Sequence, residues 1–508
     1  MSITYDPNNT QIFYAATGES YARAGPGNGL WKSTNGGSTW SKVWGGFDGA
    51  NDGSSILYMS DVVVRNNNGN SEVYVSVDTG ANSFPPSNNN GNMEGNENYG
   101  LWKSTDGGVN FSRIETFIDG TSSRHNPMDL EINPVDNKLW YSTRLGALLR
   151  STSADNITAF EEVHTISGGS RTEMEIASDG TIYAYAAASN PKLVKSTDGT
   201  NFTALTLPVD VDTDISESDF TRGQSWYDIM IDTDPSNPNT VYVGGIDLFK
   251  STTGGVDSGG ANPWTQISRW SSNNSLASLN ASWVHADQHF ITFANTDSSK
   301  KLFGNDGGIS YSETATEEQK RNATGTVGIS TRNLGLNTSQ IYTIGVAPSE
   351  MFKGVTSKMY GLSNTAWVGA ELNVDENDDV VVAGLQDNGT QLISDDTNSV
   401  SSSVNFKSGD GAASMFSQDI TKRYLIANYV YDNSIVAYNF DQVDAFGRTR
   451  AFTINRSSDS HGTFINAQAL DSKKGVLYTN GRASGINRVT MYYDCLLYTS
   501  PSPRDSDS

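Results

Sequence analysis

The sequence predicts an all-β protein, a β-propeller built from four-stranded blades. Three observations lead to this class: a short motif recurs along the first half of the chain, strand-like segments flank each copy, and helix-forming stretches are nearly absent. Strand, hairpin, strand, turn and strand, repeated about every 40 to 55 residues, is the pattern expected of propeller blades. The pattern leaves open whether the blades form tandem propellers or one large ring.

The recurring motif predicts a tight turn. Gly29–Trp40 and Gly100–Phe111 are its clearest copies, and weaker copies cover 149–155, 193–202 and 248–255. Each has the form of an Asp-box, Ser-x-Asp-x-Gly-x-x-aromatic. The Ser and Asp or Asn side chains bond nearby backbone amides, and the glycines supply positive φ. We therefore interpret the motif as structural and not as catalytic.

Antiparallel hairpins precede most of these turns. Met128–Tyr141 and Tyr227–Gly244 each read as an alternating strand, a turn rich in Asp, Pro and Asn, and a second strand. Residues 83–98 form a Gly, Asn and Pro-rich segment, which we expect to be a surface loop inserted in the second blade.

The domain organisation follows from where the motif fades. We expect a first propeller region of about six blades over residues 1–335 and further, truncated blades over 336–494. Residues 495–505 resemble a translated sequencing adapter, so 495–508 is expected to be a non-native tail and the chain a fragment.

Composition narrows the function classes. Lys and Arg total 34 against 57 Asp and Glu, and a net charge of −23 repels phosphate backbones, so we expect no nucleic-acid partner. No stretch approaches the roughly 20 apolar residues of a membrane helix, so no membrane span is expected. The single cysteine, Cys495, lies in the adapter-like tail, which leaves no disulfide and no thiolate chemistry.

The turns and the Asp-Pro-rich hairpins resemble those of the BNR (Asp-box) repeat propellers, a group with xyloglucanase-like, sortilin-type and sialidase members. A closer resemblance is to secreted bacterial, glycosyl-hydrolase-like BNR-repeat proteins, and the segments that carry it are His285–His289, Gly304–Gly308, Gly384–Thr390 and Gly409–Gly411. The resemblance implies a secreted bacterial, glycosyl-hydrolase-like protein at the cell surface or outside the cell, with type IX secretion as an expected route. It implies no single activity, because one fold hosts many functions.

Five predicted blades place an acid at the start of the innermost strand. These acids are Asp61, Asp129, Glu173, Asp228 and Glu371. Gathered into a ring, they would attract a cation, hold water or supply a carboxylate pair for glycoside hydrolysis. The structural alternative is that they bond exposed amides between neighbouring blades.

A second candidate group breaks this regularity. In an extended segment His285, Asp287 and His289 would share one face, where they could hold a metal, share a proton-transfer network or form a structural cluster. Polar residues that follow similar strands are further candidates for ligand contact: Asn305, Asp306, Gln386, Asp387 and Asn388.

The function expected from these features is polysaccharide binding or endo-type glycoside hydrolysis. Asp228 and Asp287 are the predicted catalytic pair, with His289 as a modulator. Exposed tryptophans such as Trp226 would stack on sugars. The alternative is a non-enzymatic, sortilin-like propeller that binds a protein or peptide. We expect no cofactor, and a divalent cation remains an open question.

Overall fold

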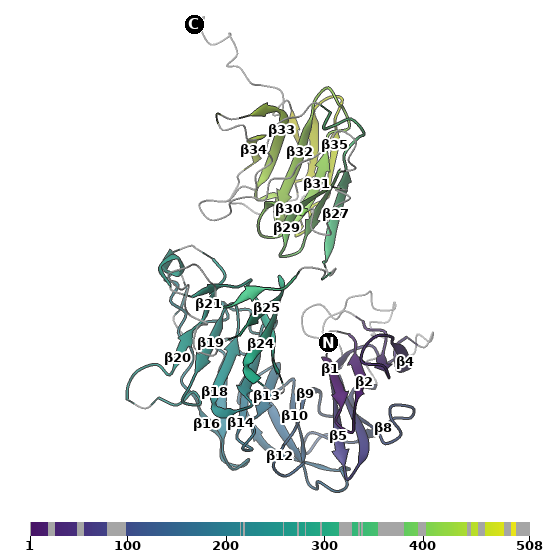
Figure 1. The fold of residues 1–508 in the computed structure, drawn as a ribbon, viewed down its shortest axis with the longest axis vertical. Coiled ribbons are helices and arrows are strands. Elements are labelled where there is room, and N and C mark those ends of the chain that lie inside the picture. Colours follow the sequence, from purple (N-terminus) through teal and green to yellow (C-terminus); the bar gives the residue numbers. More distant parts are fainter. Residues whose placement is uncertain are drawn as a thin grey trace, which may run out of the picture. The chain divides into compact units, whose positions relative to one another are not determined.

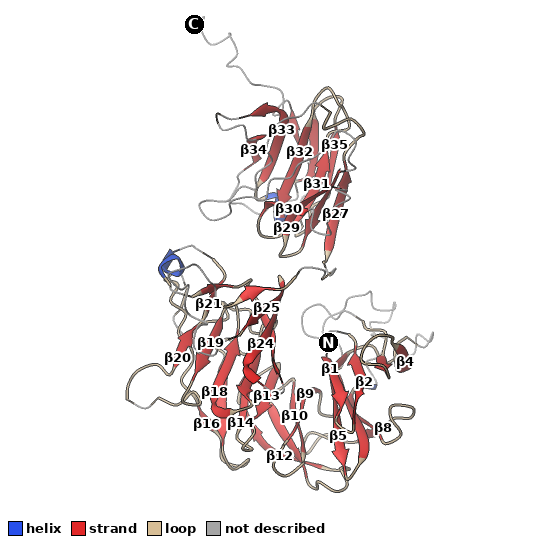
Figure 2. Ribbon diagram, in the orientation of Figure 1, coloured by secondary structure: helices blue, strands red, loops and turns tan. Residues whose placement is uncertain are grey.

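The computed structural model of the chain consists of two compact units, Met1–Arg332 and Asn333–Ser508. It describes residues 2–493 except for these segments: 19–25, 48–54, 79–97, 214, 217–218, 258, 272–273, 280, 295–296, 314–327, 334–335, 337–338, 354–379, 395–402, 444, 446–448, 456–462 and 482–488. Among the described residues almost all regular structure is strand (Figure 2).

The first unit contains six four-stranded antiparallel sheets, each a meander in chain order, which we call blades 1 to 6 (Figure 1). Their strands, blade by blade, are β1 (Ser2–Asp6), β2 (Asn9–Ala16), β3 (Leu30–Ser33) and β4 (Ser41–Trp44); β5 (Met59–Asn67), β6 (Asn70–Val77), β7 (Gly100–Ser104) and β8 (Ser112–Ile114); β9 (Pro127–Ile132), β10 (Leu139–Thr143), β11 (Ala147–Ser151) and β12 (Phe160–Thr165); β13 (Thr172–Ile176), β14 (Ile182–Ala186), β15 (Lys192–Ser196) and β16 (Thr203–Ala204); β17 (Met230–Asp234), β18 (Asn237–Gly244), β19 (Leu248–Ser251) and β20 (Trp264–Gln266); β23 (Gln288–Ala294), β24 (Asp297–Asn305), β25 (Gly308–Ser312) and β26 (Ser330–Thr331). Between blades 5 and 6 lie a parallel pair, β21 (Ser268–Arg269) and β22 (Ser282–Trp283), and the 3₁₀ helix η2 (Asn274–Ser278).

The second unit continues the pattern with two four-stranded sheets and a three-stranded sheet among its described residues, blades 7 to 9. The strands are β27 (Ile341–Val346), β28 (Val380–Leu385), β29 (Gly389–Ser394) and β30 (Ser403–Lys407); β31 (Gly411–Phe416), β32 (Tyr424–Tyr429), β33 (Ile435–Val443) and β34 (Thr449–Asn455); β35 (Gln468–Asp471), β36 (Val476–Asn480) and β37 (Val489–Tyr493), with the 3₁₀ helix η3 (Val430–Asp432). The predicted all-β, four-stranded blade architecture is confirmed.

The core is divided among the blade interfaces, and within each unit one apolar cluster lies between each pair of successive blades. Between blades 4 and 5, for example, Tyr183 and Tyr185 pack with Val241, Val243 and Phe249. The first strands of successive blades contact one another from β1 through β5, β9, β13, β17 and β23. Because each blade buries its faces only against its neighbours, residues at the start of the first strands of adjacent blades come close together.

The recurring motif forms the turn that its residues predict. In the second copy Gly108 N donates to Ser104 Oγ at 2.9 Å, and the amides of Val109 and Asn110 donate to Asp106 Oδ1 at 3.1 and 2.9 Å. These bonds to Asn110 and Ser104 lower the pKa of Asp106 to about 2. The ring of Phe111 then stacks on Trp44 at 4.2 Å between centroids.

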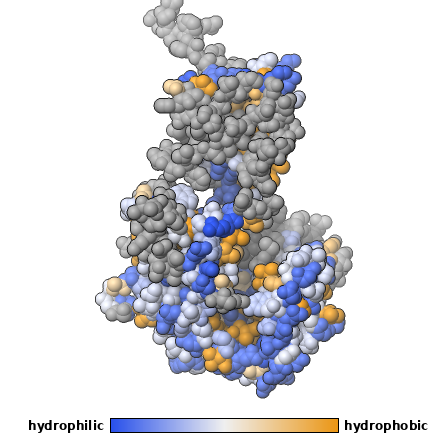
Figure 3. All heavy atoms as spheres, in the orientation of Figure 1, coloured by the Kyte–Doolittle hydropathy of each residue, from blue (hydrophilic) through white to orange (hydrophobic). Residues whose placement is uncertain are grey.

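The predicted hairpins are also present. β17 and β18 pair antiparallel, with Thr233 opposite Val241, and the turn between them is closed by the pair Asp234 and Asn237. The first blade begins at Ser2, where β1 pairs with β2. In Figure 3 hydrophilic residues cover most of the visible described surface of the first unit, with hydrophobic ones scattered among them. No helix in the described part of the chain is long and apolar enough to cross a membrane.

Candidate functional site

Two of the predicted acids, Asp61 and Asp129, bridge neighbouring blades. Asp61 accepts hydrogen bonds from Val62 N at 2.7 Å and from Leu130 N in the next blade at 2.9 Å. Asp129 repeats the arrangement with Leu130 N at 3.0 Å and Met174 N at 2.7 Å. These contacts are those of the structural alternative stated above, in which the acids bond amides between blades.

The other predicted ring members are placed differently. Glu173 pairs with Arg171, whose Nε lies 3.0 Å from Glu173 Oε1. Glu371 lies outside the described residues. Burial raises the pKa of Asp61, and burial together with the charges of Glu173 and Asp61 raises that of Asp129 well above its usual range.

A second tier of acids on the same strands was not singled out from the sequence. Glu131, Glu175 and Asp232 lie two or four residues further along β9, β13 and β17. Burial and the charge of Glu175 raise the pKa of Glu131 and of Asp232, and burial raises that of Glu175 to about 7. The alternation of acid and apolar residues in Met128–Ile132 and Thr172–Ile176 was the signal available for them.

Asp287 occupies the turn that leads from blade 5 into β23. Its φ is +64°, a left-handed conformation that few residues other than glycine adopt and that occurs often at functional sites. Its amide donates to Ile246 O at 3.2 Å, and Gln224 Nε2 donates to its Oδ1 at 3.2 Å. The local backbone is therefore not extended, and the predicted common face of His285, Asp287 and His289 is wrong.

The two histidines consequently have different partners. His285 Nδ1 lies 3.2 Å from Ala286 O, and a Cβ added at Gly307 would come within 2.4 Å of the His285 ring. His289 Nε2 lies 2.6 Å from Asp306 Oδ1, while its Nδ1 has no hydrogen-bond partner among the described residues. Asn305 Oδ1 accepts from Gly307 N at 3.0 Å, which shapes the β24–β25 turn.

Asp306 is held by side chains from two blades. Tyr227, which precedes β17, donates its hydroxyl to Asp306 Oδ1 and Oδ2, at 2.9 and 2.8 Å. Its ring meets the His289 ring edge to face at 4.9 Å. Hydrogen bonds to an ionised carboxylate are among the stronger ones in proteins. Asp306 is therefore fixed in position at the blade 5 to blade 6 junction.

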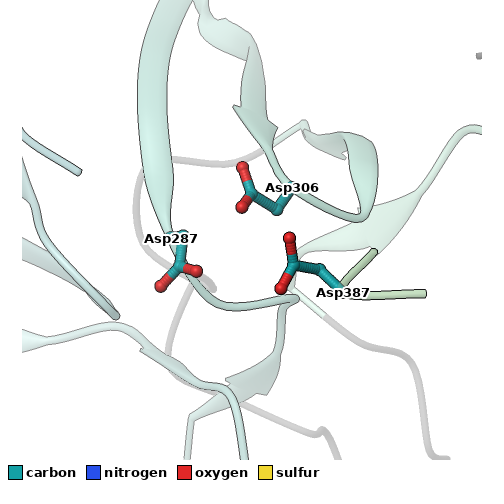
Figure 4. A group of neighbouring side chains, drawn as sticks. All are labelled: Asp287, Asp306 and Asp387. Carbon is teal, nitrogen blue, oxygen red and sulfur yellow. The ribbon is translucent and has the colours of Figure 1, made fainter. Parts of the chain in front are cut away.

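Asp287 and Asp306 form a carboxylate pair within the first unit (Figure 4). A carboxylate oxygen of one lies within 4.8 Å of a carboxylate oxygen of the other. Burial and the charge of Asp306 raise the pKa of Asp287 to about 6, against the opposing effect of His289. The geometry thus joins a carboxyl group that titrates near neutrality to a second, hydrogen-bonded carboxylate.

Asp228 does not belong to this pair. Its side chain is fully buried, and neither of its carboxylate oxygens has a hydrogen-bond partner among the described residues. Burial and the charge of Asp287 raise its pKa to about 9, so it is neutral at pH 7. A bound polymer cannot reach it in this conformation, which argues against the catalytic role predicted for it.

Gln386, Asp387 and Asn388 form the β28–β29 turn of the second unit. Gln386 N donates to Gln340 O at 3.0 Å, Asp387 N donates to Asp410 Oδ1 at 3.1 Å, and Asn388 Nδ2 donates to Gln386 O at 3.0 Å. Asp387 has φ +55°, so the turn is tight. These contacts account for the three residues as part of a hairpin.

Trp226 is an exposed aromatic residue that precedes Tyr227 in the sequence. It is 49% exposed, and its ring lies 5.6 Å from that of Tyr227, the residue that binds Asp306. Trp264, by contrast, is buried in the interface between blades 4 and 5. Trp367 lies outside the described residues.

Solved structures similar to this chain are β-propellers. An ancestral GH74 enzyme matches with a TM-score of 0.53 and 12% identity over 94% of this chain, which spans 60% of that enzyme. The GH74 enzyme of Niastella koreensis matches with a TM-score of 0.36 and 17% identity, over 96% of this chain and 67% of its own. YCF48 bound to D1 peptide matches with a TM-score of 0.39 and 11% identity, over 75% of this chain and 89% of the YCF48 chain.

No protein-family model and no curated protein matches the sequence. The likeness to the ancestral GH74 enzyme shows the fold alone: the chain is a β-propeller protein. Membership of the BNR repeat group, expected from the turn motif, remains a prediction.

Proposed function

We propose that this protein binds a polysaccharide at the blade 5 to blade 6 junction and hydrolyses its glycosidic bonds with Asp287 and Asp306. The carboxylate pair carries the proposal, because two carboxyl groups with different environments are the minimum that glycoside hydrolysis needs. The sequence predicted this reaction class with Asp228 in place of Asp306.

Asp287 is assigned as the general acid. A pKa of about 6 leaves a useful fraction of the carboxyl group protonated near neutral pH. Asp287 would give its proton to the glycosidic oxygen as the bond between that oxygen and the anomeric carbon breaks. The resulting carboxylate would then accept a proton from the water that completes hydrolysis.

Asp306 is assigned as the second carboxylate. Hydrogen bonds from Tyr227, and from His289 when its Nε2 carries a proton, stabilise the ionised form. Oxygens within 4.8 Å correspond to the short separation typical of retaining enzymes. In that reaction Asp306 attacks the anomeric carbon and forms a glycosyl ester, which water hydrolyses with Asp287 as base.

Trp226 is assigned to substrate binding. Its exposed ring lies beside the ring of Tyr227, the residue that donates a hydrogen bond to Asp306. A flat apolar face with a polar neighbour suits a sugar ring, whose C–H groups pack on aromatic surfaces while its hydroxyls bond to polar groups.

The proposal places the protein outside the cell, where polysaccharides are met, in agreement with the secretion predicted from the sequence. Support comes from the turn motif, which resembles that of secreted propellers, and from a fold similar to that of an ancestral GH74 enzyme. Recovery of the protein from culture medium would test the location.

The activity test is reducing-sugar release from β-glucans, xyloglucan and other plant and algal polysaccharides. Asp287→Asn and Asp306→Asn should each lower release by about 10²–10⁴-fold, the usual contribution of a catalytic acid or base. Asp297→Asn is the matched control. Asp297 begins β24, the strand that ends next to Asp306, but it accepts a hydrogen bond from Ser299 at the opposite end of that strand.

Four outcomes separate the possibilities. If both site variants lose sugar release and the control variant keeps it, hydrolysis by this pair is supported. Release that persists in both variants would place the active site elsewhere. If the folded protein binds polysaccharide but releases no sugar, binding without catalysis is supported. If it neither binds polysaccharide nor releases sugar, the peptide-binding alternative is favoured.

A further inference from the structure

A buried polar network in the second unit surrounds Asp432. Asp432 is 2% exposed and lies with Tyr431 in the β32–β33 connection, where both residues have φ +57°. Its Oδ1 accepts hydrogen bonds from Asn428 Nδ2 at 2.7 Å and Gln468 Nε2 at 2.8 Å, and Asn466 Nδ2 donates to its Oδ2. Three side-chain amides therefore converge on one buried carboxylate.

Two of these amides leave a buried oxygen without a partner. Asn428 Oδ1 and Gln468 Oε1 meet no hydrogen-bond donor among the described residues. Asn428 as a whole is fully buried. Asn433 Oδ1, one residue from Asp432, is a third such oxygen. A buried acceptor left unsatisfied costs free energy, and most such groups in folded proteins are satisfied. The cluster therefore lacks a ligand that oxygen atoms would bind.

The orientation of the amides decides which ligand fits. Asn466 is oriented by contacts on both sides, because its Oδ1 accepts from Thr463 N at 3.2 Å and its Nδ2 donates to Asn480 O at 2.8 Å. The side chains of Asn428 and Gln468 bond only to Asp432 within the described residues. Each can turn over and present its oxygen in place of its nitrogen.

After that rotation, two amide oxygens would stand 2.7 and 2.8 Å from Asp432 Oδ1, where the nitrogens now stand. Oxygen acceptors repel one another at such distances unless a cation lies between them. Ligand oxygens around Ca²⁺ sit at about 2.3–2.6 Å from the ion and crowd together in this way. The oxygens left without donors thus become the ligands.

We propose that the second unit binds Ca²⁺ through Asp432, Asn428 and Gln468, with water completing the coordination. Carboxylate and amide oxygens are the ligands that this hard cation prefers. One carboxylate supplies the only protein charge among these ligands, so the affinity should be modest, about 10⁻⁴–10⁻³ M, the range of extracellular modules. The site is independent of the proposed hydrolysis in the first unit.

The first test is a Ca²⁺ titration of the full chain. Calorimetry measures the binding and thermal unfolding measures the stability, and Mg²⁺ is titrated for comparison. Ca²⁺ should raise the unfolding temperature, and Tb³⁺ should give luminescence excited through the neighbouring Tyr431. Asp432→Asn should weaken Ca²⁺ binding by at least about tenfold, because ligand charge sets affinity. Asp441→Asn, which alters a surface pair with Arg423, should leave it unchanged.

A second variant keeps the proposal testable if Asp432→Asn does not fold. Gln468→Glu adds a charge to the ligand set, so a Ca²⁺ site predicts about tenfold tighter binding and a larger Ca²⁺-induced rise in unfolding temperature. A network that only exchanges hydrogen bonds predicts a less stable variant that Ca²⁺ does not rescue. That result, or the absence of Ca²⁺ and Tb³⁺ binding by the unaltered protein, would overturn the proposal.

Discussion

Tyr227 donates its hydroxyl to both carboxylate oxygens of Asp306, across 79 residues of sequence. Tyr227 stands before the first strand of blade 5, and Asp306 lies in the β24–β25 turn of blade 6. The contact therefore depends on the packing of one blade against the next, and it orients the carboxylate toward Asp287.

Tyr227→Phe should lower the proposed hydrolytic activity while leaving the fold intact. A hydrogen bond to a charged group contributes about 1.5–3 kcal/mol, which corresponds to roughly a 10- to 100-fold loss in kcat. Sugar release and thermal unfolding measured on one preparation would check this. Tyr5→Phe, at an exposed residue of β1, is the control; equal losses in both variants would show that Asp306 does not need Tyr227.

Activity should decline as pH rises through about 6, because Asp287 must be protonated to act as general acid. The pKa of Asp287 in the folded protein exceeds its ordinary value of 3.8, so above pH 3.8 the unfolded chain loses this proton first. The stability that the neutral carboxyl gives is full below that pH and is lost as pH rises toward 6.

Asp287→Asn tests the same shift through stability alone. The side chain at position 287 is neutral at every pH in this variant. The unfolding temperature of the variant should therefore rise relative to that of the unaltered protein between pH 4 and pH 7. If the unfolding temperatures of the two proteins change with pH by the same amount across this range, a raised pKa for Asp287 is contradicted, whatever the activity.

Asp228→Asn should preserve activity within a few-fold at pH 7. The carboxyl group is buried and has a pKa of about 9, so the amide replaces a group that is already neutral. Sugar release and circular dichroism would be measured together. A folded Asp228→Asn protein without activity would restore Asp228 to the catalytic role that the sequence predicted.

Asp61→Ala should destabilise the first unit. It removes the acceptor of Val62 N and Leu130 N, and a buried donor left without a partner costs about 1–3 kcal/mol. Urea unfolding would report the loss. Glu161→Ala, at an exposed strand position, should change stability much less; equal effects would mean that the bridge between blades 2 and 3 contributes nothing specific.

Local features of the fold were predictable because neighbouring residues determine them. The Ser104 and Asp106 side chains satisfy amides two to four residues away, so their turn could be read from the motif. The Thr233 to Val241 pairing follows likewise from alternation and a turn-rich centre. The sequence predicts Asp287 and Asp306 each as a site residue, but not as a pair.

By itself, the sequence determined the blade: its turns, its hairpins and its all-β class, each set by contacts over a few residues. Only the tertiary structure decided the site. Packing of blade 5 on blade 6 buried Asp228, brought Tyr227 to Asp306 and turned Asp287 into a left-handed conformation. The physical reason is that burial and charge proximity, which set a carboxyl group's exposure and pKa, arise from residues far apart in the chain.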